Sequence, residues 1–199
     1  MRTAVLFALV IALGAAIGIG LKQASSDGGK ASAYPEALKP TAQEVEDKLG
    51  GAPAPLAALH AQSGELLGGE RAALRERLAL VKGHPAVVNV WASWCGPCRA
   101  EMPVPQRVAL DRGREVAFIG VNLKDERGAA ERFLRRAPVS FPSYEDPDGE
   151  IYDWYGLAGA PATIFYDERG RRAFVHQGPY RSAEELEEDI DRYALGTAS

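Results

Sequence analysis

The sequence predicts an α/β protein in which helices flank a central mixed β-sheet and a membrane segment precedes it. Short apolar runs at 86–91 and 115–123 have the composition of strands covered on both faces, and helical patterns alternate with them. An uncharged run of 18 residues, Ala4–Leu21, lies ahead of these patterns. With 199 residues, of which 46% are hydrophobic and 25% charged, the chain can bury the core of one globular domain.

The uncharged run has the length of a short transmembrane helix, because 1.5 Å per residue gives roughly 27 Å. Arg2 precedes the run and Lys22 follows it, so the positive-inside tendency places the body outside the cytoplasm. We therefore expect a signal anchor over 1–22 that binds the membrane, and an extracytoplasmic domain. That domain would be secreted if the segment were cleaved, for which Ala31–Ala33 is a candidate site.

Residues 23–40 are rich in Ser, Gly, Ala and Pro, a composition typical of a flexible linker. One domain is then predicted over 41–199, with its core at 84–195. The net charge is −4 and no stretch gathers five Lys or Arg, so nucleic acid is not an expected partner. We expect a monomer.

The domain begins with helices and continues as alternating strands and helices. Thr41 and Glu44 form a capping box that opens a short helix. The later elements are predicted in this order: a helix at 70–82, a strand at 86–91, a helix after the cysteines, a strand at 115–123, a helix at 126–137, strands at 162–167 and 171–178, and a helix opened by Ser182. The core order βαβαββα, with a parallel pair and an edge hairpin, is a thioredoxin-like arrangement.

Both cysteines of the chain, Cys95 and Cys98, lie in the segment WASWCGPCRAEMP. A zinc site needs further ligands, and covalent haem attachment needs a His where Arg99 stands, so we expect no metal and no cofactor. A peroxiredoxin would carry Pro and Thr where Val88 and Ala92 occur. A structural staple would gain little stability from so small a loop. The spacing, after a buried strand and before a helix, indicates a redox-active dithiol.

The two cysteines occupy different positions on the expected helix, so we expect them to have different roles in thiol exchange. Unpaired N–H groups and the helix dipole favour a thiolate at Cys95, so its pKa should lie below the usual value of about 8.5. Cys98 lies one turn further in and faces the core, which suits it to resolve a mixed disulfide. Pro97 fits the first helical turn because it needs no N–H there.

The segments VVNVWASWCGPCRAEMP and GAPATIFYDERG resemble the thioredoxin superfamily. Within it they are most similar to the TlpA/ResA branch of redoxins, which are tethered extracytoplasmic thiol–disulfide oxidoreductases. The resemblance implies that Pro161 is a cis-proline facing the disulfide and that Ala160 offers backbone groups to a substrate strand. Trp94, beside Cys95, is a candidate substrate contact.

Two polar positions agree with this branch. Asn89 stands where cytoplasmic thioredoxins carry a buried acid, so that acid is missing. Glu101 follows Cys98 by three residues, on the same helix face, and resembles the glutamate that the branch places near its cysteines. We interpret Glu101 as the proton acceptor that completes the catalytic set with Cys95 and Cys98; its charge would keep the pKa of Cys95 in the upper part of the C-x-x-C range. The alternative is a solvated helix residue.

The resemblance implies reduction of exported thiol or disulfide proteins, for example apocytochrome c before haem attachment, with electrons from a membrane thiol donor. Two alternatives stay open. The protein could form disulfides in secreted proteins, because about 30 mV of potential is only about 1.4 kcal/mol. It could also be a peptide-binding module without turnover.

Several other residues receive structural interpretations. Pro103 and Pro105 predict a kink, with the helix resuming near Gln106. Trp154 is expected at the rim of the core, and His176 to be hydrogen-bonded on a strand.

Overall fold

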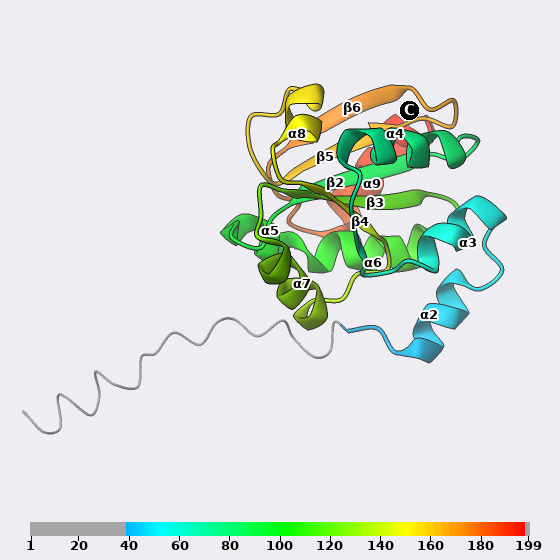
Figure 1. The fold of residues 1–199 in the computed structure, drawn as a ribbon. Coiled ribbons are helices and arrows are strands. Elements are labelled where there is room, and N and C mark those ends of the chain that lie inside the picture. The colour runs from blue at the N-terminus through cyan, green and yellow to red at the C-terminus, as the bar shows by residue number, and fades with distance from the viewer. Residues whose placement is uncertain (1–38, 198–199) are drawn as a thin grey trace, which may run out of the picture. The chain divides into compact units, whose positions relative to one another are not determined.

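The strands within residues 39–197, the part of the chain that the computed structural model describes, form one sheet of six (Figure 1). Their order across the sheet is β1-β4-β3-β2-β5-β6. The first four in that order are mutually parallel, whereas β5 runs antiparallel to both β2 and β6. The predicted mixed sheet is confirmed. The strands are β1 (Leu66–Leu67), β2 (Ala86–Trp91), β3 (Ala117–Leu123), β4 (Ser143–Asp146), β5 (Ala162–Tyr166) and β6 (Arg172–Gln177).

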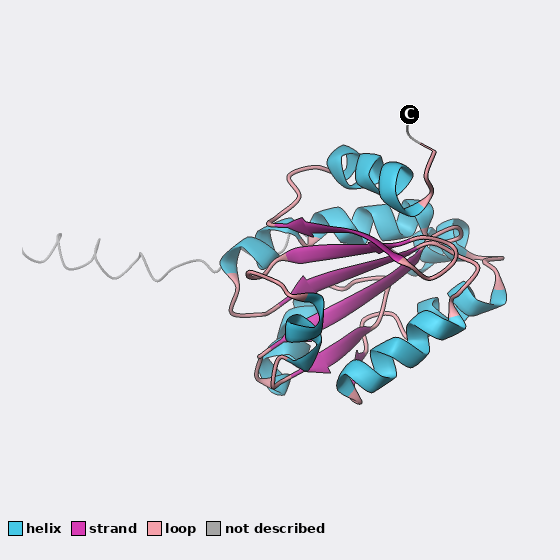
Figure 2. Ribbon diagram, turned by 90° about the horizontal axis from the view of Figure 1, so that it is seen from above, coloured by secondary structure: helices cyan, strands magenta, loops and turns pink. Residues whose placement is uncertain are grey.

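Helices cover both faces of the sheet (Figure 2). They are α2 (Ala42–Leu49), α3 (Ala54–His60), α4 (Glu70–Leu80), α5 (Gly96–Glu101), α6 (Pro103–Arg112), α7 (Arg127–Arg136), α8 (Glu150–Tyr155) and α9 (Ala183–Asp189), which continues as a π-helical turn, Ile190–Ala194. Thr41 Oγ1 accepts the Glu44 N–H at 3.1 Å, so the predicted cap of α2 is confirmed. The flanked sheet agrees with the fold class expected from the sequence.

Strand β2 is the centre of the fold, and all six of its residues are buried. Its side chains alternate between the two faces of the sheet because a strand has a period of two. Val88 and Val90 pack in the core cluster with Leu74 of α4 and Ile151 of α8. Asn89 points to the other face, where it meets α5. One face therefore carries the main apolar core, and the other receives the polar groups beside the cysteines.

The sequence-based element order was incomplete. Strand β4 and helix α8 lie between α7 and β5, and neither was predicted, nor were α3 and the two-residue strand β1. The predicted kink is confirmed, because α5 ends at Glu101. Pro103 and Pro105 have no N–H group to donate, so the run of helical hydrogen bonds is interrupted there. The helix resumes at Pro103 itself and not near Gln106, since proline is tolerated in a first turn.

Across residues 39–197, no helix combines the length and the apolar composition needed to cross a membrane. The predicted signal anchor at 1–22, and the predicted linker up to residue 38, lie outside the described residues.

Candidate redox-active site

Cys95 and Cys98 form a disulfide with an S–S distance of 2.04 Å at the carboxyl end of β2. Cys95 is the N-cap of α5, and its Sγ accepts the N–H of Cys98 at 3.2 Å. Cys95 is 4% exposed, whereas Cys98 is fully buried beneath it. The sulfur nearer to solvent is thus also the one that receives a helix N–H, which favours negative charge on it once the disulfide opens.

The loop before β5 approaches the same sulfur. The carbonyl oxygen of Ala160 lies 3.6 Å from Cys95 Sγ, and the peptide bond between Ala160 and Pro161 is cis. Strand β5 is the antiparallel neighbour of β2, so its first residues lie beside the end of β2 that leads to Cys95. The fold therefore brings Cys95 close to Ala160 and Pro161, which are distant from it in the sequence and which the sequence had indicated as site residues.

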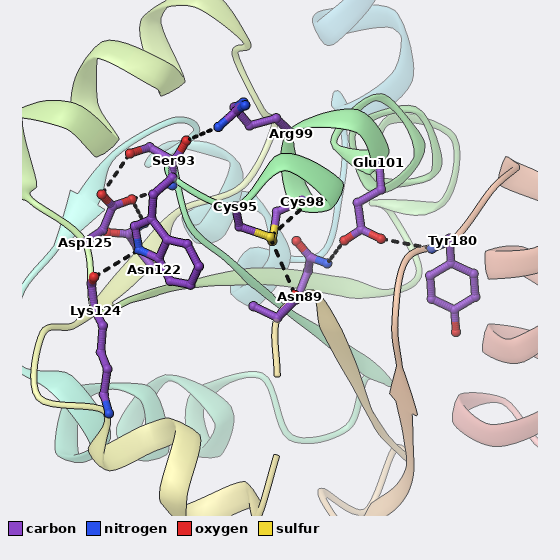
Figure 3. Close-up of a disulfide and its surroundings, with 12 residues drawn as sticks. Asn89, Ser93, Cys95, Cys98, Arg99, Glu101, Asn122, Lys124, Asp125 and Tyr180 are labelled. Atoms are coloured by element: carbon purple, nitrogen blue, oxygen red, sulfur yellow. Dashed lines mark hydrogen bonds between the residues drawn. A yellow bond between two sulfur atoms is a disulfide. The ribbon is translucent and has the colours of Figure 1, made fainter. Parts of the chain in front are cut away.

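Glu101 is buried, with 3% of its surface exposed, so the alternative of a solvated helix residue is wrong. Its two carboxyl oxygens accept hydrogen bonds from different parts of the fold (Figure 3). Asn89 Nδ2 of β2 donates to Oε1 at 3.0 Å, and the Tyr180 N–H, from the loop before α9, donates to Oε2 at 2.9 Å. The carboxyl group is fixed between the central strand and the C-terminal loop.

Burial raises the pKa of the Glu101 carboxyl to about 7, although the hydrogen bonds from Asn89 and from the Tyr180 N–H act in the opposite direction. Loss of hydration destabilises the carboxylate more than two neutral donors stabilise it. A carboxyl group with this pKa both accepts and releases protons near neutral pH.

Asn89 replaces the missing acid with a neutral amide. Its Nδ2 also lies 3.4 Å from Thr163 Oγ1, but its Oδ1 is buried and has no hydrogen-bond partner among the described residues. In Figure 3 the amide of Asn89 is drawn between the disulfide and Glu101. A buried acceptor without a donor is unfavourable, so this oxygen remains available to a donor that enters the site.

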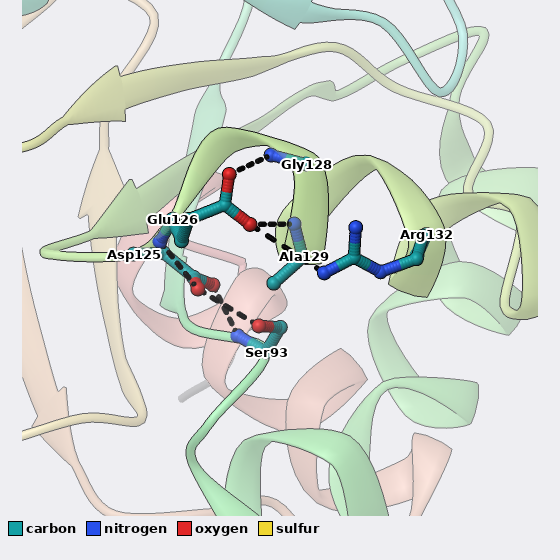
Figure 4. Close-up of polar contacts among 6 residues, drawn as sticks. All are labelled: Ser93, Asp125, Glu126, Gly128, Ala129 and Arg132. Atoms are coloured by element: carbon teal, nitrogen blue, oxygen red, sulfur yellow. Dashed lines mark hydrogen bonds and ion pairs between the residues drawn. The ribbon is translucent and has the colours of Figure 1, made fainter.

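A second carboxylate, Asp125, holds the loop that precedes Cys95 (Figure 4). It accepts hydrogen bonds from both the N–H and the hydroxyl of Ser93, and from Asn122 Nδ2. The next residue, Glu126, caps α7 through the N–H groups of Gly128 and Ala129. Asp125 therefore connects the loop between β2 and α5 to the end of β3.

Two further contacts fix the surface around the cysteines. Trp94 is 58% exposed, and its Nε1 donates to the carbonyl of Lys124 at 3.0 Å. Arg99 donates to the carbonyl of Ser93 at 2.8 Å. The indole is thus both accessible and held in one orientation, as a substrate contact requires.

Sequence reasoning missed Asp125, Ser93, Thr163 and Tyr180. Asp125 had a usable signal, because it follows β3, and parallel neighbouring strands end at the same edge of a sheet. Tyr180 had none, since it contributes a backbone N–H. Within 39–197 no three His, Cys, Asp or Glu side chains group so that they could hold a metal ion.

Residues 74–190 match the family described as Redoxin. The chain is 39% identical over 120 residues to a thiol:disulfide interchange protein DsbE of Allochromatium vinosum, covering 57% of this chain and 64% of that one. It is 30% identical over 103 residues to a thiol-disulfide oxidoreductase ResA of Oceanobacillus iheyensis, covering 51% and 54%. The chain thus spans between about half and just under two thirds of the length of these curated relatives.

Among solved structures, a secreted Mycobacterium tuberculosis disulfide oxidoreductase, described as homologous to E. coli DsbE, superposes with a TM-score of 0.52. The identity is 29%, and the match covers 57% of this chain and 85% of that one. The fold is therefore shared with oxidoreductases of thioredoxin-like architecture.

The raised pKa of Glu101 predicts how stability depends on pH. Between the ordinary value of 4.5 and about 7 the folded state keeps a proton that the unfolded state has released, so the free energy of unfolding falls as pH rises through this window. The fall should be about 3 kcal/mol and absent in Glu101→Gln. Urea unfolding of the oxidised protein from pH 4 to pH 8 measures it.

Glu76→Gln is the matched control, since Glu76 is exposed and the substitution removes the same charge. It should keep the pH dependence of the wild type. A constant stability difference between wild type and Glu101→Gln across this pH range would contradict the raised pKa.

Proposed function

The chain belongs to the Redoxin family, and from this premise we propose that it is a thiol:disulfide oxidoreductase whose reacting groups are Cys95 and Cys98. The observation that carries the proposal is the Cys95–Cys98 disulfide at the start of α5, with the outer sulfur near the surface and the inner one buried. Relatives named for thiol:disulfide exchange support the same reaction class.

Cys95 is the nucleophile of the proposed reaction. Its thiolate attacks one sulfur of a substrate disulfide, forms a mixed disulfide and releases one substrate thiolate. The Ala160 carbonyl, 3.6 Å from Cys95 Sγ, is an acceptor for the N–H of a substrate strand that pairs beside the cysteine. The exposed ring of Trp94 offers apolar contact to that strand.

Cys98 completes the exchange. Its thiolate attacks Cys95 Sγ, re-forms the internal disulfide and releases the second substrate thiolate, so two electrons pass from the pair to the substrate. The proton of Cys98 has to leave first, because a thiol attacks poorly. Glu101, buried on the same side of α5 and titrating near neutral pH, is the proposed acceptor of that proton.

The favoured direction is reduction of exported proteins, with apocytochrome c as the example and a membrane thiol protein as electron donor. The negative charge of Glu101 disfavours a thiolate nearby, whereas strong oxidants stabilise their reduced, thiolate form. An extracytoplasmic, membrane-anchored location is supported by the apolar run Ala4–Leu21, which has the length of a short transmembrane helix.

Substitution of each cysteine tests the reaction. In insulin reduction by dithiothreitol, the wild type should accelerate turnover and Cys95→Ser should abolish the acceleration, because the attacking sulfur is lost. Cys98→Ser should instead accumulate a mixed disulfide through Cys95, seen as a band on non-reducing gels. Undiminished activity of Cys95→Ser would contradict the proposal that the protein is a thiol:disulfide oxidoreductase. If the wild type bound substrate without turnover, it would instead be a peptide-binding module.

The equilibrium reduction potential of the pair tests the direction. In glutathione or dithiothreitol buffers we expect a reduction potential close to that of a reductant, about −270 mV. A value near that of a strong oxidant, about −120 mV, would show that the protein forms disulfides in its substrates. Glu76→Gln, which removes a charge far from the cysteines in sequence, should leave the potential unchanged.

A further inference from the structure

A pocket of about 520 Å³ lies against helices α4 and α8 and the turn between β5 and β6. This volume is within the range of small-molecule sites. The residues that line it are mainly cationic and aromatic. None of them belongs to the redox-active site.

The pocket lies at the opposite end of the central strand from the cysteines. Tyr166 pairs with Ala86, the first residue of β2, whereas Cys95 and Cys98 follow its last residue, Trp91. A ligand here would not occupy the surface on which a substrate disulfide meets Cys95.

Positive charge is concentrated in this pocket although the whole chain carries a net charge of −4. Four of the lining residues are cationic, and no Asp or Glu lines the pocket in the described part of the chain. Arg75, Lys82 and Arg169 form no ion pair with any residue of 39–197. The local charge is therefore not neutralised by the protein itself, which favours an anionic ligand.

Aromatic rings supply the apolar surface of the pocket. Trp154 is 38% exposed, and its ring centroid lies 4.7 Å from that of Tyr155. Arg172 lies over the Tyr155 ring at 5.9 Å and donates to the Tyr155 carbonyl at 3.3 Å, so its guanidinium group is held in place. A flat apolar ring can pack on the exposed indole of Trp154, which Tyr155 supports from beneath, while an anionic group attached to that ring contacts the cations.

A buried hydroxyl pair adds a hydrogen-bond donor. The hydroxyl oxygens of Tyr166 and Tyr155 are 2.9 Å apart, and both side chains are more than nine-tenths buried. Burial raises the pKa of both phenols, so both keep their protons at neutral pH. The two hydroxyls share one hydrogen bond, which uses one of their two protons. The other O–H has no acceptor within 39–197. Such a donor is unfavourable unless a ligand or water accepts it.

We propose that this pocket binds a small planar aromatic molecule that carries one anionic group. The ring packs on the exposed part of Trp154, and the anionic oxygens accept hydrogen bonds from the cations at the rim and from the unpaired tyrosine hydroxyl.

NMR of the oxidised, ¹⁵N-labelled full chain tests the proposal with two isosteric probes, naphthalene-2-sulfonate and its uncharged sulfonamide. The chain has three tryptophans, so each indole N–H reports on one place. The sulfonate should shift the Trp154 signal saturably and leave those of Trp91 and Trp94 in place. The sulfonamide should bind at least about ten-fold more weakly, because it brings no charge.

Two double variants with equal change of net charge separate this pocket from general attraction of anions. Lys82→Glu with Arg169→Glu should weaken sulfonate binding by at least about ten-fold. Arg135→Glu with Arg136→Glu, at the exposed end of α7, should change it by less than about two-fold. Equal loss in both variants, equal affinity for both probes, or a shift at Trp94 in place of Trp154 would overturn the proposal.

The hydroxyl donor has its own test. Tyr155→Phe combined with Tyr166→Phe keeps both rings and removes both hydroxyls, so it should weaken binding of the sulfonate more than binding of the sulfonamide, whose oxygens are weaker acceptors. Unaltered sulfonate affinity in this variant would remove the hydroxyl from the site.

Discussion

The arrangement of the redox-active site depends on the hydrogen bonds of one buried carboxyl group, that of Glu101. It ties helix α5 to the central strand through Asn89 and to the C-terminal loop through the Tyr180 N–H. Burying a charged carboxylate between neutral donors is unfavourable, and the protein responds with a pKa of about 7, so that the group holds a proton part of the time. The burial that destabilises the carboxylate in the folded protein thus gives the site a carboxyl group that can gain or lose a proton near neutral pH.

The remaining parts of the site meet because of the sheet. Strands β2 and β3 are parallel neighbours, so the loop with Ser93 and the loop with Asp125 leave the same edge and join by hydrogen bonds. Strand β5 runs antiparallel to β2, so its first residues return Ala160 to that edge. Three connections that are distant in sequence thus fix the position of one sulfur, in keeping with the location of ligand sites at the carboxyl ends of parallel strands.

Local signals in the sequence were enough to predict the central strand, the edge hairpin, the cysteine pair and the helix face shared by Cys98 and Glu101. Strand β4 escaped prediction because Ser143–Asp146 is short, partly polar and without a long apolar run. The environment of Glu101 could not be predicted either, since one of its two hydrogen-bond donors is the N–H of Tyr180, which lies 79 positions further along the chain. The unpredicted parts are those that tertiary contacts create.

The rate at which Cys98 closes the mixed disulfide, measured against pH, tests the role of Glu101 most directly. Reduced protein is mixed with 5,5′-dithiobis(2-nitrobenzoate), and release of the second thionitrobenzoate is followed by stopped flow. In the wild type the closing rate should rise to a plateau with a midpoint of about 7. In Glu101→Gln it should be about a hundred-fold slower at neutral pH and keep rising toward the ordinary thiol pKa of about 8.5. Superimposable pH profiles for the two proteins would show that Glu101 does not accept the proton of Cys98.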